Sequence, residues 1–132
     1  GPLFDFVKLQ SINNNYLSAL STQELYDQGL KRAQQYQPAL AQLMTEDAEY
    51  TLAALDIERH TEKDPKRFTL YSDIEKNIRF FYDSEWETIK AEKADFPEGI
   101  ELSTWKAFAE DYAANYSLDG DVLTRFEQLK TI

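Results

Sequence analysis

Apolar side chains that recur every three to four residues constrain this chain more than any other feature. They form three clear stripes, which are Ala48, Leu52 and Leu55, then Ile74, Ile78 and Phe81, then Trp105, Phe108, Ala109 and Tyr112. This spacing places apolar side chains on one face of an α-helix, whereas a strand would need a strict alternation that the chain lacks. Glycine and proline number only four each, so few helix breakers interrupt the pattern. We therefore predict an all-α fold, organised as a helical bundle.

Several helix starts carry the Ser-x-x-Glu pattern, in which hydroxyl and carboxylate satisfy free N–H groups reciprocally. The pattern occurs at Ser21-Glu24, Ser72-Glu75 and Ser84-Glu87. Together with the apolar spacing, it predicts helices over residues 5–18, 22–35, 38–44, 46–60, 72–82, 84–94, 103–116 and 120–131. The main loops are then 61–71 and 95–102, and we expect the second loop to join two subdomains.

Composition limits the class of protein. A chain of 132 residues that is 42% hydrophobic can build a core, as one domain or as two small helical subdomains. Cysteine is absent, which favours a reducing, cytoplasmic setting, and no apolar run is long enough to predict a membrane span. The start Gly1-Pro2 is typical of a remnant left by protease trimming of a longer protein.

Charge is distributed unevenly along the chain. The net charge of −10 argues against a nucleic-acid-binding protein, because such proteins are usually basic. Residues 59–79, however, hold six basic side chains against four acidic ones, and the stretch 59–67 reads RHTEKDPKR. This segment is either an RNA-facing loop, in which Lys and Arg meet phosphates and Phe68 and Tyr71 stack on bases, or a solvated charged loop.

Three asparagines stand in the first predicted helix, although asparagine is a poor helix former. Counted from Leu9, Asn13 is at i+4 and Tyr16 at i+7, so both lie on an apolar stripe, whereas Asn14 and Asn15 point away from it. A buried amide must be paired. We therefore expect Asn13 and Tyr16 to be structural, with the Asn13 side chain hydrogen-bonded to the backbone of a neighbouring loop or helix end.

Catalytic and metal-binding patterns are not found. His60 is the only histidine, so a zinc site is not expected. The 24 acidic residues read as a solvated surface rather than as a catalytic pair, and no glycine-rich phosphate loop is present. We predict no catalytic residue, no metal site and no cofactor in this chain.

The first helix also carries a resemblance. Phe4-Asp5-x-x-Lys8-Leu9-x-x-x-Asn13-x-x-Tyr16-Leu17 resembles the segment that follows the catalytic core of bacterial-type glutamyl-tRNA synthetases. Further similar stretches are Leu20-Ser21-x-x-Glu24-Leu25, Phe68-Thr69-Leu70-x-x-Asp73-Ile74 and Arg79-Phe80-Phe81-Tyr82. The chain departs from the family at Ser11, where the family usually has Trp.

The resemblance implies the all-helical anticodon-binding region of a class I synthetase. Residues 3–95 would form the connecting and first anticodon-binding subdomain, and 96–132 a second subdomain, divergent or truncated at its end. The parent enzyme would attach glutamate to tRNA with ATP and Mg²⁺. Its HIGH and KMSKS-type signatures do not occur here, so we expect the chain alone to be inactive. The resemblance also implies that the chain binds glutamate-specific tRNA, and we expect it to do so as a monomer.

The resemblance also implies where RNA would bind. In the family, an arginine three residues before the Thr of the Thr-Leu turn helps to read the anticodon, and Lys66 stands in that position. Lys lacks the bidentate fork of Arg, so phosphate contact is expected of it rather than base reading. The residues predicted to contact RNA are Arg59, Lys63, Lys66, Arg67 and Thr69.

An acidic helical protein-interaction module that binds no RNA is the alternative. The two hypotheses differ in one structural requirement, because RNA binding needs residues 59–79 to form one exposed basic face.

Overall fold

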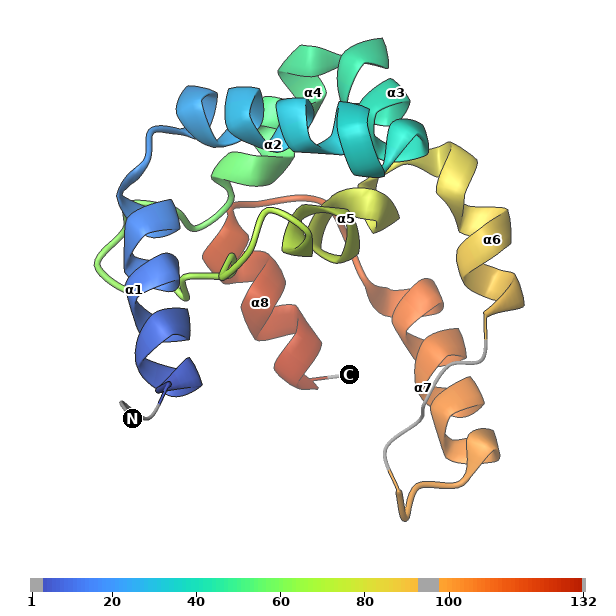
Figure 1. Cartoon of the computed structure of the whole chain (residues 1–132). Coiled ribbons are helices and arrows are strands. Elements are labelled where there is room, and N and C mark those ends of the chain that lie inside the picture. Colours follow the sequence, from blue (N-terminus) through green and yellow to red (C-terminus); the bar gives the residue numbers. More distant parts are fainter. Residues whose placement is uncertain (1–3, 93–97, 132) are drawn as a thin grey trace. The chain divides into compact units, whose positions relative to one another are not determined.

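The structure is a computed structural model that describes residues 4–92 and 98–131. Within these ranges the secondary structure is helical and contains no strand, which confirms the all-α prediction. The helices are α1 (Phe6–Ala19), α2 (Thr22–Tyr36), α3 (Pro38–Glu46), α4 (Ala48–Asp56), α5 (Asp73–Ile78), α6 (Trp86–Ala91), α7 (Leu102–Asn115) and α8 (Val122–Thr131) (Figure 1). Two 3₁₀ turns, Arg79–Phe81 and Asp83–Glu85, lie between α5 and α6. The chain divides into two compact units, residues 1–92 and 93–132.

One of the three predicted capping boxes is confirmed. At the start of α2, the Ser21 hydroxyl accepts a hydrogen bond from the Glu24 amide at 3.2 Å, and the Glu24 carboxylate accepts one from the Ser21 amide at 2.8 Å. The hydrogen bonds that the Ser21 amide and the Ser21 hydroxyl donate to the Glu24 carboxylate lower the pKa of Glu24. The boxes predicted at Ser72 and Ser84 are wrong. The Ser72 side chain makes no cap hydrogen bond, and Ser84 lies inside a 3₁₀ turn, so that α6 begins only at Trp86.

Helix α4 is shorter than predicted, because it ends at Asp56 rather than near residue 60. Ile57 already has ψ of 122°, and Glu58 and His60 have φ of 58° and 55°. These positive φ values belong to the left-handed region, which stops a right-handed helix. The chain therefore turns at 57–60 and enters the following loop earlier than the apolar pattern suggested.

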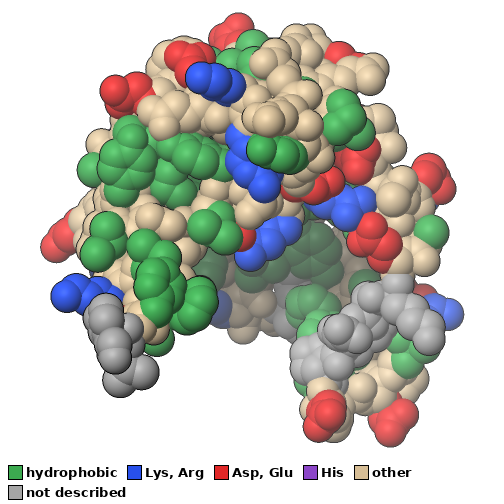
Figure 2. Space-filling view, viewed as in Figure 1, with side chains coloured by type: hydrophobic (Ala, Val, Ile, Leu, Met, Phe, Trp, Pro, Cys, Tyr) green, Lys and Arg blue, Asp and Glu red, His purple; other side chains and the backbone are tan. Residues whose placement is uncertain are grey.

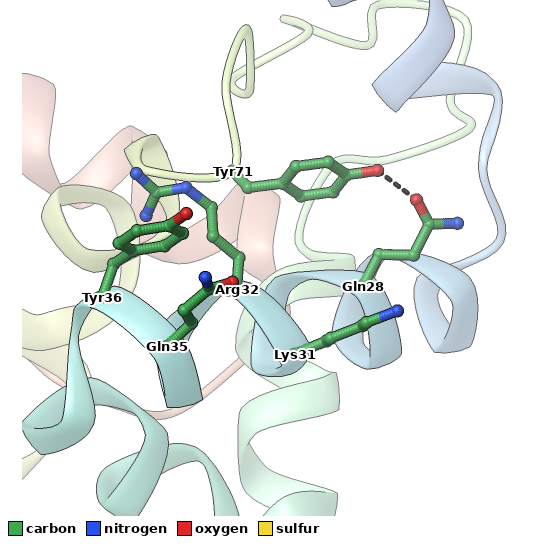
Figure 3. Close-up of a pocket in the computed structure, with 6 residues that line it drawn as sticks. All are labelled: Gln28, Lys31, Arg32, Gln35, Tyr36 and Tyr71. Atoms are coloured by element: carbon green, nitrogen blue, oxygen red, sulfur yellow. Dashed lines mark hydrogen bonds between the residues drawn. The ribbon is translucent and has the colours of Figure 1, made fainter.

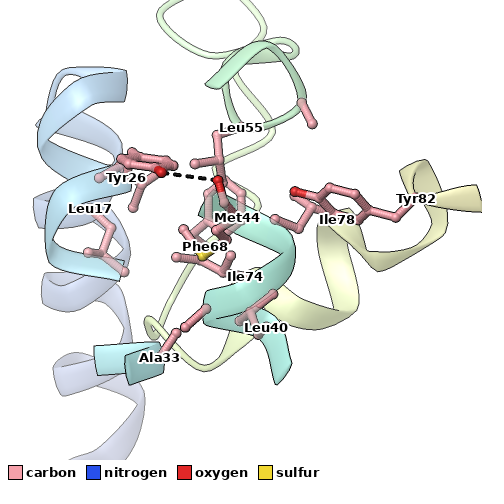
Figure 4. Close-up of a cluster of buried hydrophobic side chains, with 13 residues drawn as sticks. Leu17, Tyr26, Ala33, Leu40, Met44, Leu55, Phe68, Ile74, Ile78 and Tyr82 are labelled. Atoms are coloured by element: carbon pink, nitrogen blue, oxygen red, sulfur yellow. Dashed lines mark hydrogen bonds between the residues drawn. The ribbon is translucent and has the colours of Figure 1, made fainter. Parts of the chain in front are cut away.

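The core of the first unit lies between α2, α3, α4 and α5 (Figure 4). Its most deeply buried large side chains are Leu25, Met44, Leu55, Phe68, Ile74 and Ile78. Gly29 lets α2 approach α5, because a Cβ atom at this position would lie 2.4 Å from Ile74 Cδ1. The polar group of Tyr26 is paired inside the core, since its hydroxyl donates to the Met44 carbonyl at 3.0 Å.

The second unit contains α7 and α8, and none of their residues is buried. The aromatic residues of α7 follow one another along one face, as their spacing predicted. The ring centroids of Trp105 and Phe108 are 6.4 Å apart, and those of Phe108 and Tyr112 are also 6.4 Å apart. None of the described helices in either unit is both long and apolar enough to cross a bilayer.

Candidate nucleic-acid interface

The loop of residues 57–72, which contains all five predicted RNA contacts, is fastened to α1 by Asn14. The Asn14 side-chain amide donates to the Lys66 carbonyl at 2.7 Å and to the Phe68 carbonyl at 3.0 Å, and it lies 3.4 Å from Thr69 Oγ1. Because Phe68 itself is buried in the core, these bonds hold the loop between a packed side chain and a helix. The backbone on both sides of Arg67 is therefore held in place relative to α1.

The prediction that Asn13 makes this contact is wrong. The structure shows no hydrogen bond between the Asn13 side chain and any described residue. The apolar stripe used for the prediction is itself exposed, with Leu9 at 40% and Ile12 at 55%, and Leu17 is the buried residue of α1. Tyr16 is 55% exposed, so it is no core residue, and it lines a small pocket together with Asn13.

Arg59 forms part of the first unit's interior and is only 8% exposed. Its guanidinium donates to the Leu17 carbonyl at 3.3 Å and to the Leu20 carbonyl at 2.5 Å, while His60 Nε2 lies 3.0 Å from the Ser18 carbonyl. The last carbonyls of a helix lack partners within the helix, and a cation is favourable there. Burial lowers the pKa of Arg59. Arg59 thus caps α1, and the prediction that its charge is available to RNA is wrong.

Arg67 plays the same part at the end of α4. Its Nη2 lies 3.3 Å from the Ala54 carbonyl, 3.1 Å from the Leu55 carbonyl and 3.0 Å from the Ile57 carbonyl. Its guanidinium carbon lies 5.0 Å from the centroid of the Phe68 ring. Burial lowers the pKa of Arg67 as well. Its side chain is thus engaged within the fold, contrary to the predicted RNA-facing role.

Lys63 and Lys66 are the predicted cations that the loop leaves in solvent. The Lys66 ammonium donates to Asn15 Oδ1 at 2.7 Å, and the Lys66 amide donates to Asp64 Oδ1 at 2.7 Å. Thr69 is half-buried, and its amide donates to the Asp73 carboxylate at 3.0 Å. The structure brings Lys66 and Thr69 together through Asn14, and it leaves Lys63 further out on the exposed part of the loop.

Residues 59–79 do not form one exposed basic face. Besides the two capping arginines, Arg79 pairs with Glu92 at 2.9 Å and with Glu85 at 3.5 Å, and Lys76 pairs with Asp73 at 3.1 Å. Figure 2 shows one face of the molecule, on which basic side chains lie among acidic and apolar ones. The requirement set for RNA binding is therefore met only in part: Lys63, Lys66 and Lys76 are exposed, and Lys76 is paired with Asp73.

Sequence reasoning missed two features of this surface. Asn14 could have been found only by knowing which face of α1 is buried. The second feature is an open groove on α2 that is lined by Gln28, Lys31, Arg32, Gln35 and Tyr36, with Tyr71 from the loop (Figure 3). The i, i+3, i+4, i+7 spacing of its first four residues is visible in the sequence and could have revealed it.

Comparison with known proteins agrees with the resemblance seen in the first helix. No family model matches the chain, and no solved structure matches it. A glutamate–tRNA ligase of Sorangium cellulosum is 41% identical over 100 residues, which is 76% of this chain and 17% of that protein. Glutamate–tRNA ligases of Clostridium beijerinckii and Acetivibrio thermocellus are 25% and 26% identical over the whole chain.

The chain spans between 17% and 24% of the length of these relatives. All three of these relatives are glutamate–tRNA ligases, and the helical fold agrees with the resemblance seen in the sequence. By sequence, the chain therefore belongs with the glutamate–tRNA ligases, as the counterpart of one part of their length.

Proposed function

We propose that this chain is the anticodon-binding region of a glutamate–tRNA ligase and that it contacts tRNA through Lys63 and Lys66. The observation that carries the proposal is that these two exposed cations stand on a loop held in place by Asn14, in a chain related to these ligases. The parent protein would attach glutamate to tRNA with ATP and Mg²⁺ in the cytoplasm. This chain would supply RNA contact as a monomer, without a catalytic residue or cofactor of its own.

The loop suits this task because hydrogen bonds from Asn14 hold its backbone on both sides of Arg67. Binding costs less free energy when side chains and backbone need no ordering in the complex. Screening limits the reach of each charge to about 8–10 Å at physiological salt, so the two lysines can act despite a net charge of −10. With only two phosphate contacts, we expect weak binding and a slope of about −2 in log affinity against log salt.

The test compares two double variants with the same change in charge. Lys63→Glu with Lys66→Glu alters the proposed contact, whereas Lys90→Glu with Lys106→Glu alters two exposed helical lysines elsewhere. Fluorescence anisotropy with a glutamate-specific tRNA transcript at low salt should show at least a tenfold loss of affinity for the first variant and a loss of about twofold or less for the second. Equal losses would mean that only total charge matters.

A protein-interaction module without RNA contact is the second candidate. It is favoured by the exposed apolar side chains at the start of α1, where Phe4, Phe6 and Val7 are 66%, 69% and 76% exposed. Single residues of this kind are ordinary, but a contiguous group favours contact with protein. If the wild-type chain fails to bind tRNA even at low salt, this candidate replaces the RNA-binding proposal.

A further inference from the structure

The groove on α2 is built from one helix face and one loop residue, all within the first unit. Gln28, Lys31, Arg32 and Gln35 project from one face of α2, next to the face that buries Leu25, and Tyr71 closes one edge (Figure 3). The Tyr71 hydroxyl donates to Gln28 Oε1, which joins the loop to the helix. The groove has a volume of about 510 Å³ and is open to solvent on one side.

The chemistry of the groove is cationic and aromatic, and none of its lining residues is acidic. Lys31 is exposed, and the Arg32 guanidinium carbon lies 5.2 Å from the centroid of the Tyr36 ring. Arg32 is held there because its Nη1 donates to Gln37 Oε1 at 2.8 Å. The Tyr36 side chain remains 63% exposed and can accept a second flat group.

These groups match what a single RNA strand offers. Lys and Arg pair with phosphates, an exposed aromatic ring stacks on a base of any identity, and Gln amides can donate to and accept from base edges. An acidic peptide would satisfy the cations but would leave the exposed ring and the amides without a use. The chemistry of the groove therefore favours RNA.

The groove continues toward the loop contact proposed above. Tyr71 also lines the neighbouring smaller pocket, together with Tyr16 and Thr69. Thr69 and Lys66 are joined in turn by the amide of Asn14. Exposed or half-buried polar and aromatic side chains thus run from Lys66 to the groove, with a cation at each end.

We propose that the α2 groove binds an unpaired nucleotide of the RNA that contacts Lys66, with its base stacked on Tyr36 and its phosphates against Lys31 and Arg32. This inference rests on the proposed function, because the same RNA strand would pass from the loop over Tyr71 into the groove. It adds a second, stacking contact that does not depend on which base is bound.

The test uses the 132-residue chain and a fluorescein-labelled single-stranded RNA of mixed sequence. Tyr36→Ala should weaken binding about tenfold, within the range for loss of one base–aromatic stack. Lys31→Glu should weaken binding and make the salt slope less steep by about one, as expected for loss of one phosphate contact. The matched controls are Phe80→Ala, which removes a ring that is 44% exposed, and Lys90→Glu, and both should change affinity by less than about twofold.

The outcomes separate the two proposals. If Tyr36→Ala and Lys31→Glu bind like wild type while the Lys63→Glu, Lys66→Glu variant loses affinity, the groove inference fails and the proposed function stands. If the groove variants lose affinity while the loop variant does not, the loop contact fails instead. If wild type binds no RNA, both are overturned. If polyglutamate displaces the RNA and Tyr36→Ala has no effect, the groove is only an anion site and the stacking proposal is wrong.

Discussion

Replacing Asn14 by alanine removes the amide that fastens the 57–72 loop to α1. An NH₂ group has two hydrogens, so it makes two good bonds, to the carbonyls of Lys66 at 2.7 Å and Phe68 at 3.0 Å. The contact with Thr69 at 3.4 Å shares a hydrogen and adds little. Each bond stabilises the fold by about 1 kcal/mol, and alanine regains about 0.6 kcal/mol of helix propensity. The net loss for Asn14→Ala is about 1.5 kcal/mol.

Urea unfolding measures this loss directly. With an m value of about 1.5 kcal/mol/M, typical of a small domain, the midpoint should fall by about 1 M. Within the described residues the Asn13 side chain has no hydrogen-bond partner, and the Asn15 side chain accepts a bond from the exposed Lys66 ammonium. Alanine at either position should therefore change the free energy of unfolding by less than about 0.5 kcal/mol. A variant of Asn13 that loses as much stability as Asn14→Ala, or an unchanged midpoint for Asn14→Ala, would refute the assignment.

Two further predictions concern the same loop. Arg67→Ala should lower the free energy of unfolding by about 2 kcal/mol, because it leaves the last carbonyls of α4 unpaired, whereas Lys63→Ala should change it by less than about 0.5 kcal/mol; thermal melts with similar shifts for both would contradict the capping role. Burial raises the pKa of Asp73, but hydrogen bonds from amide N–H groups, including that of Leu70, and from the Lys76 ammonium lower it by more. The pKa of Asp73 therefore lies below the ordinary value of an aspartate. The Asp73 carboxylate therefore stabilises the fold fully above its unfolded pKa, and this contribution is lost as the pH falls through the folded value. The stability difference between wild type and Asp73→Asn should shrink between pH 6 and pH 3 in urea titrations, and a constant difference would count against it.

Much of the helical framework was readable from the chain because helix formation is a local process. The spacing of Ile74 and Ile78 and the capping box at Ser21 depend on residues within one or two turns, and both appear in the structure as expected. The Ser-x-x-Glu pattern at Ser72 shows a limit of prediction from local sequence. A capping box also needs a particular backbone geometry at its first residue, and Ser72 has φ of −65° and ψ of −18°, already helical.

The roles of the polar residues in the candidate site depended on contacts between distant parts of the chain. Arg59 looked like a surface cation, but it caps carbonyls that lie 42 and 39 positions earlier, and Asn14 reaches 52 positions along to the Lys66 carbonyl. The sequence around a cation in a short basic segment does not indicate whether its side chain will lie in solvent or at the end of a helix. That choice follows from how the loop folds back over α1 and α4, because the unpaired carbonyls there attract the nearest guanidinium.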